Sequence, residues 1–415
     1  MPFTGRCVLP ARARTRLSFL VLALALLTAA LAPAARADDR PFSPTGVWNT
    51  PLSSAAVLDA NSAGLSAELL RQRTTYGLWI NTRSYSAPVY QVPAGAPTQS
   101  VYLDTPSAMY TNATDAANLR SQLSAVPIPA NAVHAAGSDR HMVIWQKSTD
   151  TMWELWLAYK VPDEVTPWGT NNIPGWHAAW GARIDHVSQN PGINSKPFGA
   201  TASGLPLMGG MITLADLQKG SIDHALSMAL PNTAAGTYAW PANRTDGAWT
   251  GVNAIPEGTR FRLNPALDLS KVTLSPMARM IAKAMQTYGV IVRDRSSSVV
   301  LYGEDPTPTM LLGNPNPYVA AYGGLSSDAI LAQIPWASLQ AVSAVQPAPA
   351  ASTTTTTTST TTTSTGGTTT TTTAPRKLRR TSTTARTASR RKACRSRKAK
   401  AHRRSRCTHR VRRHR

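Results

Sequence analysis

Short segments in which apolar and polar residues alternate run along most of the chain, separated by Gly, Pro, Asn and Asp. Alternation with a period of two is typical of half-buried β-strands, and these four residue types favour turns. The segments are VYQVPAG, QSVYLD, RHMVIWQK, MWELWLAYK, ARIDHVS, TRFRLNP, GVIVRD and SVVLYGED. The pattern predicts a mainly β protein, a two-sheet β-sandwich of jelly-roll type with two or three short helices packed on it.

Helical periodicity is confined to a few places. Ser275 and Pro276 begin an apolar stripe that continues to residue 288 and ends at Gly289, which predicts one amphipathic helix. Thr213 as cap and Gly220 as terminator predict a second, short helix over 214–219. A third helix is expected near 65–73.

The segment GSIDHALSMAL, residues 220–230, reads as a strand with one polar residue on its apolar face. Strand alternation places His224 beside Leu226 and Met228, and Asp223 on the other face. A buried imidazole with both nitrogens paired is one interpretation. The other is that this face forms the floor of a cleft, where His224 carries protons.

Composition divides the chain into four regions. Arginines precede an apolar run that ends in Ala35-Arg36-Ala37, so residues 1–37 are expected to be a signal peptide and the mature chain to be secreted. Residues 38–345 form the predicted body, with no transmembrane anchor. Residues 346–375 are rich in Pro and Ala and then in Thr and Ser, and predict a disordered linker. Residues 376–415 are expected to be a disordered Arg/Lys-rich tail.

The net charge of +22 comes from this tail and not from the body. The tail holds 19 of the 43 Lys and Arg residues and the first 37 residues hold 5, whereas all 21 Asp and Glu lie in the body. A slightly acidic body excludes a basic module for specific nucleic-acid binding. In an exported chain, we expect the tail to bind an anionic cell-wall polymer, with extracellular DNA, acidic lipid or a purely solubilising role as alternatives. The body also lacks cysteine, which excludes a disulfide framework or a thiolate metal site there.

Several segments resemble one family of proteins. They are GATASGLPLMGGMITLADLQKGSIDHAL, GSDRHMVIWQ, MWELW, PANRTDG, IPEGTRFRL and QTYGVIVRD. Together they are similar to a family of secreted bacterial proteins common in soil actinobacteria, most of them uncharacterised, over about residues 46–305. The resemblance implies export and one integral body domain, and it implies no particular activity.

Two clusters offer acid, base and stacking chemistry. Asp139 and His141 are two residues apart, so a strand would project them together, with the carboxylate orienting the imidazole or both binding one metal ion. Two ligands do not make a site, so we predict no metal or other cofactor, although a divalent metal is left open. Glu154 and Trp156 share a strand face, and Trp180 follows in a loop-rich segment. Indole rings stack on sugars and a carboxylate can act as acid or base, but buried core tryptophans are the alternative.

Arg260 and Arg262 share one face of the segment TRFRLNP, and Arg244 lies in the loop PANRTDG. Arginines on an open sheet face can bind acidic sugars or phosphate, although a solvated face is the commoner outcome. The chain has no Gly-x-Ser-x-Gly elbow, Walker loop or His-Glu-x-x-His helix, which disfavours α/β-hydrolases, NTPases and zincins.

The leading hypothesis is a secreted protein of the cell envelope that binds a polysaccharide and cleaves it by hydrolysis or by elimination. Its expected catalytic residues are His224, His141, Glu154 and Asp139. The expected substrate-binding residues are Trp156, Arg262, Arg260, Asp223 and Trp180. The alternative is a non-catalytic envelope protein that is held in place by its basic tail.

Overall fold

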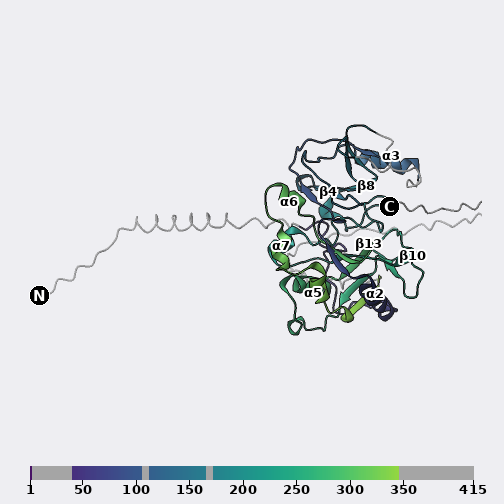
Figure 1. The fold of residues 1–415 in the computed structure, drawn as a ribbon, viewed down its shortest axis with the longest axis vertical. Helices are drawn as coiled ribbons and strands as arrows, with labels where there is room; N and C mark the ends of the chain where they lie inside the picture. Colours follow the sequence, from purple (N-terminus) through teal and green to yellow (C-terminus); the bar gives the residue numbers. More distant parts are fainter. Residues whose placement is uncertain (2–39, 105–111, 165–171, 345–415) are drawn as a thin grey trace, which may run out of the picture. The chain divides into compact units, whose positions relative to one another are not determined.

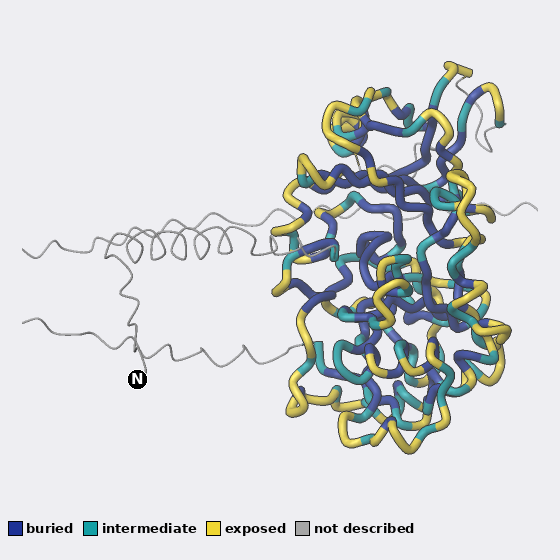
Figure 2. Tube along the Cα trace, turned by 90° about the vertical axis from the view of Figure 1, so that its left-hand side faces the viewer, coloured by how far each residue is buried: buried dark blue, intermediate teal, exposed yellow. Residues whose placement is uncertain are grey.

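A six-stranded sheet and a four-stranded sheet organise the computed structural model, which describes Met1 and residues 40–104, 112–164 and 172–344. The described residues from 40 on belong to one compact unit. In Figure 1, β4, β8 and α3 lie on one side of β13, and α2 and α5 lie on the other. Burial follows the same plan, because the chain inside the body is buried and its surface loops are exposed (Figure 2). The predicted signal peptide, linker and tail lie outside the described residues.

The six-stranded sheet mixes parallel and antiparallel pairs. Its strands, in spatial order, are β1 (Leu78–Asn81), β14 (Val299–Tyr302), β9 (Leu226–Leu230), β13 (Val290–Arg295), β12 (Arg260–Leu263) and β15 (Leu339–Val342). The pairs β1–β14 and β9–β13 are parallel, and β9–β14, β12–β13 and β12–β15 are antiparallel. Every residue of β9 is buried, as expected for a strand covered on both faces.

Helices cover one face of this sheet. Helix α5 (Pro276–Thr287) begins at the Ser275 cap with Pro276 in its first turn, and it buries Met277, Ile281 and Met285. Helices α2 (Ser62–Tyr76) and α8 (Ser327–Ala332) join it in one apolar core with the sheet. Helix α4 (Leu214–Lys219) is closed by a capping box between Thr213 and Asp216 and ends at Gly220. The remaining described helices are α3 (Ala113–Gln122), α6 (Thr307–Leu311) and α7 (Pro317–Tyr322), with 3-10 turns at Lys147–Thr149, Val187–Gln189, Leu269–Lys271 and Trp336–Ser338.

The four-stranded sheet is buried on both faces. It consists of β2 (Val89–Gln91), β4 (Met142–Gln146), β5 (Thr151–Trp156) and β8 (Trp180–Asp185), in that order. Val143 and Trp145 point toward a core that also contains Ile291 of the six-stranded sheet. Met142 and Ile144 point to the opposite core, which contains residues of α3 and of the three-stranded sheet. That third sheet is β3 (Val101–Leu103), β7 (Gly175–Ala178) and β6 (Tyr159–Val161), and β10 (Thr233–Tyr238) pairs with β11 (Ile255–Glu257).

A sheet-rich body with short helices is therefore confirmed. Each of the eight alternating segments contains a strand, and the helices expected at 276–288, 214–219 and 65–73 are present. The strand expected over 220–230 is wrong in its first half, because β9 begins at Leu226 and His224 lies in the irregular segment before it. In the part of the chain that the structure describes, no helix is long and apolar enough to cross a membrane.

Candidate active site

A cleft of about 500 Å³ opens between the two main sheets. Its walls come from the segment before β4, the end of β5, the start of β8, the loop at 197–202, the loop at 244–246 and the end of β13. Four of the residues predicted as functional line it, namely Asp139, His141, Trp156 and Trp180. The fold thus brings together two of the sequence clusters that lie apart in the chain.

Two tryptophans form one wall of the cleft. Trp156 is the last residue of β5 and Trp180 the first of β8, and the antiparallel register places them directly opposite each other. The Trp180 indole Nε1 donates to the Pro197 carbonyl at 3.2 Å, which fixes that ring against the loop. Trp156 stays half-buried, with part of its surface in contact with both apolar cores of the four-stranded sheet. Trp180 is itself buried in the core that contains α3, as the core-tryptophan alternative requires, so Trp156 offers most of the open indole surface on which a sugar ring can stack.

Glu154 holds the loop behind this wall and does not face the cleft. Its carboxylate is fully buried and accepts hydrogen bonds from the Asn194 amide at 2.7 Å, Ala200 N at 2.8 Å and Leu207 N at 2.7 Å. Burial raises the pKa of Glu154, and these three donors and Arg293 lower it, with burial the larger effect. The prediction that Glu154 acts as acid or base in the cleft is therefore not supported by its position, and its contacts define a structural carboxylate.

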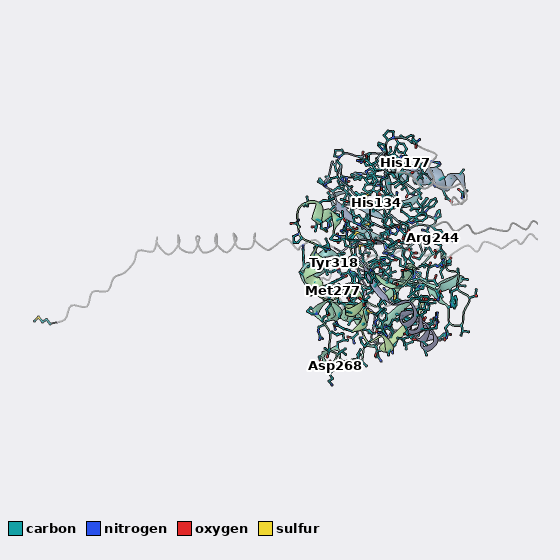
Figure 3. All side chains as sticks on the ribbon, viewed as in Figure 1. His134, His177, Arg244, Asp268, Met277 and Tyr318 are labelled. Atoms are coloured by element: carbon teal, nitrogen blue, oxygen red, sulfur yellow. The ribbon has the colours of Figure 1, made fainter. Side chains whose placement is uncertain are left out.

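Arg244 holds the same loop from the other side. Its guanidinium donates to the carbonyls of Ala202 at 3.1 Å, Phe198 at 2.9 Å, Gly199 at 3.0 Å and Thr201 at 2.6 Å, and also to that of Pro197. In Figure 3, Arg244 lies at mid-height of the body, below His177 and above Met277. With its donors used on backbone carbonyls, Arg244 shapes the cleft and has little left with which to bind an anionic substrate.

Three carboxylates that the sequence analysis did not single out meet at the cleft. Oxygens of Asp246, Glu257 and Asp294 all lie within 4.8 Å of one another, and Asp246 and Asp294 line the cleft itself. Burial, followed by the charges of Asp294 and Asp246, raises the pKa of Glu257 to about 9. Burial, with Asp246 and Asp139 nearby, raises the pKa of Asp294 to about 7, although Arg293 and the Arg295 amide oppose this. Glu257 and Asp294 therefore favour their protonated forms near neutral pH, as acids that lie close to other carboxylates do.

The same three carboxylates are the only group of His, Cys, Asp and Glu side chains in the described residues that is arranged to hold a metal ion. Three oxygens are few for Ca²⁺, which takes six to eight, and a cation there would depend mainly on water. The raised pKa values describe a cluster that retains protons, and we interpret it in that way.

His141 is a neutral base at the bottom of the cleft. Its ring is buried, and its Nδ1 has no hydrogen-bond partner among the described residues. Burial lowers the pKa of His141 to about 4, and the nearby Arg293 acts in the same direction, while Asp139 opposes it. Asp139 lies in the turn before β4, where its carbonyl accepts from Leu157 N at 2.8 Å.

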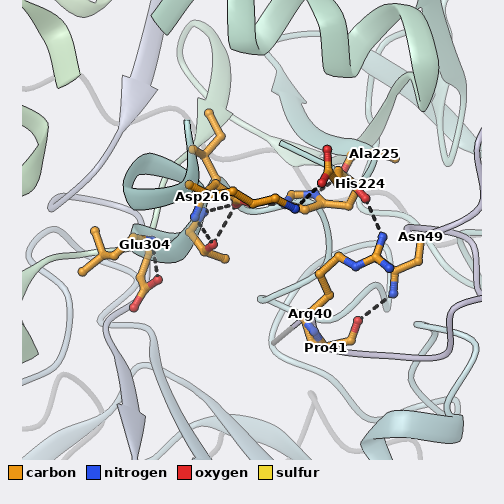
Figure 4. A network of polar contacts seen from close by, with 12 residues as sticks. Arg40, Pro41, Asn49, Asp216, His224, Ala225 and Glu304 are labelled. Atoms are coloured by element: carbon orange, nitrogen blue, oxygen red, sulfur yellow. Dashed lines mark hydrogen bonds and ion pairs between the residues drawn. The ribbon is translucent and has the colours of Figure 1, made fainter. Parts of the chain in front are cut away.

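His224 lies outside the cleft, in the core network shown in Figure 4. Its Nδ1 is 2.8 Å from the Ala225 carbonyl and its Nε2 is 3.0 Å from Asp216, the carboxylate that also caps α4. Burial disfavours the charge on His224, but the hydrogen bond and ion pair with Asp216 outweigh burial and raise its pKa. Both ring nitrogens are paired, as the core interpretation requires, and His224 does not line the cleft with the other predicted catalytic residues.

The remaining predicted binding residues also lie away from the cleft. Asp223 pairs with Lys219 at the end of α4. Arg260 donates to the Val47 carbonyl, and Arg262 donates to Gln340 at 3.1 Å and to the Ser53 carbonyl at 2.9 Å. Arg262 is buried, so these arginines do not lie on an open sheet face as expected. They tie the N-terminal segment and β15 to β12.

The fold and cleft define a sheet-rich protein with an acidic, tryptophan-lined site between two sheets. A comparison with protein-family models, curated proteins and solved structures finds no match to this chain. The family resemblance suggested by the sequence therefore stays a prediction, and function is argued from the cleft alone.

Proposed function

We propose that the cleft binds a polysaccharide and hydrolyses it. One observation carries this proposal: the half-buried Trp156, with Trp180 opposite it in the sheet, shares a cleft of about 500 Å³ with the proton-holding carboxyl of Asp294. Stacking surface and a carboxylic acid that is protonated near neutral pH are the two elements that glycosidic bond cleavage needs from a protein.

Asp294 acts as the general acid in this proposal and Asp246 as the nucleophile. The Asp294 carboxyl gives its proton to the glycosidic oxygen while an Asp246 oxygen bonds to the anomeric carbon and the bond from that carbon to the leaving oxygen breaks. Water then attacks the glycosyl ester and passes a proton back to Asp294, which releases Asp246. An oxygen of each carboxylate lies within 4.8 Å of the other, which is closer to the short separation of retaining enzymes than to the wider one of inverting enzymes.

Elimination from a uronic acid is the other cleavage route, and the cleft contains one side chain that could act as its base. That group is His141, which is neutral near pH 7, although its pKa of about 4 makes the imidazole a weak base. Elimination also needs cations that offset the uronate charge, and the arginines that line the cleft are engaged elsewhere. Arg244 binds backbone carbonyls, and Arg295 lies 3.8 Å from Asp246. Hydrolysis is therefore the better supported route, with His141 and Asp139 positioning sugar hydroxyls.

The setting of this activity is part of the proposal. The export signal and the basic tail support a secreted protein that is held at the cell envelope by an anionic wall polymer. The apolar core shared by Val143, Trp145 and Ile291 supports a β-sandwich built from the two main sheets. Jelly-roll connectivity stays a prediction, and the parallel pairs of the six-stranded sheet differ from its usual antiparallel order.

The test is to incubate the full mature chain with a panel of neutral and uronate-containing polysaccharides, and to follow reducing ends and the ultraviolet absorbance of new double bonds. We expect reducing ends without absorbance, retention of anomeric configuration by NMR, and a fall of about 10²- to 10⁴-fold in Asp294→Asn. Asp163→Asn, at an exposed carboxylate outside the cleft, serves as the matched control and should be fully active. The absence of product and of binding across the panel would refute the proposal and favour the non-catalytic envelope protein.

A further inference from the structure

A second cleft of about 560 Å³ adjoins the first, and the two share Asp139 and Arg295 as lining residues. The second cleft is lined by Trp79 and Asn81 of β1, Tyr85, the serines at 296–298 and Tyr302 of β14. Hydroxyl, amide and aromatic side chains predominate along it. Since the shared residues stand at the boundary, a chain molecule bound in the first cleft can continue directly into the second.

The floor of the second cleft is the outer face of the six-stranded sheet at its β1 edge. The parallel register pairs Trp79 with Val300 and Asn81 with Tyr302, so these four side chains share one face. The alternate residues, such as Ile80 and Leu301, point to the helix-covered core. Trp79 is 52% exposed on this face, although a tryptophan ordinarily buries most of its surface. An indole left open beside the buried Asn81 and Tyr302 offers a stacking surface for a sugar ring.

Tyr85 is held rigidly beside that floor. It has a left-handed backbone with φ of 59°, a conformation that non-glycine residues rarely adopt, and its amide donates to the Ala136 carbonyl at 2.9 Å. Gly137 lies directly under the ring, because a Cβ at that position would come within 3.0 Å of it. Tyr85 nevertheless remains 44% exposed. Backbone strain that keeps an aromatic ring in an open position is a feature of binding sites.

The charges of the two clefts restrict the kind of glycan. Asp139 and Asp246 line them beside Asp294, which holds its proton, whereas His141 is neutral near pH 7, Arg244 donates to backbone carbonyls and Arg295 lies 3.8 Å from Asp246. A uronate or sulfate along this path would meet carboxylates without a free cation to offset its charge. A neutral sugar chain meets no such penalty.

We propose that the substrate is an extended neutral polysaccharide that runs through both clefts, stacking on Trp156 in the first and on Trp79 and Tyr85 in the second. This inference rests on the proposed function, since it names the substrate class of the same site. The bond that is cleaved lies beside Asp246 and Asp294, and the second cleft binds sugar units several positions away. Long oligosaccharides therefore gain affinity that short ones do not.

The experiment measures binding of the full mature chain to neutral gluco-, xylo-, manno- and chito-oligosaccharides of about two to eight units, together with uronate oligosaccharides, by calorimetry. We expect the longer neutral chains to bind Trp79→Ala about tenfold more weakly than wild type, with disaccharides unaffected. Trp156→Ala should weaken binding of both. Trp249→Ala, at an exposed tryptophan that lines neither cleft, is the control and should bind as wild type does.

Three results would overturn the inference, and they can be told apart. If Trp79→Ala binds long chains as tightly as the wild-type protein and Trp156→Ala binds them more weakly, the second cleft takes no part in binding, but the proposed function stands. Tighter binding of uronate chains than of neutral ones refutes the neutral substrate. No binding of any oligosaccharide by the wild-type protein refutes the proposed function, and the inference falls with it. Circular dichroism of each variant establishes that it is folded.

Discussion

Carboxyl groups at the cleft favour their protonated forms, and this has a consequence for stability. Asp294 and Glu257 have pKa values of about 7 and about 9 in the folded protein, against 3.8 and 4.5 as ordinary values. The folded state therefore binds more protons than the unfolded state between about pH 4 and 9, so these groups make the free energy of unfolding fall as pH rises through that window. We expect the free energy of unfolding of Asp294→Asn, relative to that of the wild type, to increase from pH 5 to pH 8. Urea unfolding at each pH measures this difference. A constant difference between the two proteins across that range would contradict it.

The proposed role of Asp294 as general acid also predicts how activity should depend on pH. A general acid must hold its proton, so hydrolysis should decline as pH rises through about 7. The measurement is kcat/KM against pH on whichever neutral glycan is cleaved, with buffers of constant ionic strength. A profile that is flat from pH 6 to pH 9 would assign the acid role to another group.

Glu154 is predicted to matter for stability and not for chemistry. Glu154→Gln keeps the shape of the side chain but turns one acceptor oxygen into a donor that faces backbone or amide N–H groups. We expect a loss of about 3 kcal/mol in the free energy of unfolding, and weaker glycan binding because the loop at 194–207 loosens. The check is urea unfolding beside Asp163→Asn, which should be unchanged within about 0.5 kcal/mol.

Helix α4 and His224 form one unit at the scale of elements. Asp216 closes the capping box with Thr213 and also forms an ion pair with the protonated ring of His224. Because the pKa of His224 is raised on folding, its stabilisation is complete below the unfolded value of 6.5 and is lost as pH rises through the folded value. His224→Gln should therefore lower the stability of the protein more at pH 5.5 than at pH 8.5. Thermal unfolding of the variant and the wild type at both pH values measures this. Equal gaps would mean that the pair is not ionised.

Local signals predicted these elements well because they act within a few residues. The caps Ser275 and Thr213 and the terminator Gly220 fix helix ends without reference to the rest of the fold. Strand pairing is different, since the register of β1 with β14 joins residues more than 200 positions apart. His224 was placed in a strand because its neighbours alternate, but its bonds to Asp216 and Ala225 hold it before the strand begins.

The candidate site shows the same division at the scale of the whole molecule. Asp139, His141, Trp156 and Trp180 were predictable from residue type and spacing, and the fold brings them to one cleft. Asp246, Glu257 and Asp294 come from a loop, the end of β11 and β13, and each one alone looks like a turn or strand-end acid. The segments RTDG, IPEG and IVRD contain these three residues, but no sequence pattern predicts that the segments lie close together in the folded protein.

The charge distribution of the chain supplies the last prediction. The tail from Arg376 on holds 19 Lys and Arg and no acid, whereas the residues before it hold every Asp and Glu. The proposed attachment to an anionic wall polymer would therefore be electrostatic, and we expect it to weaken steeply with salt. A chain that ends at residue 344 should lose retention on anionic wall material at physiological salt but keep its activity on a soluble neutral glycan. Sedimentation with purified walls at about 50 and 500 mM salt measures the first property, and reducing-end release the second. Wall retention that survives both the truncation and high salt would show that the body carries the attachment, because only a site on the folded part could then account for it.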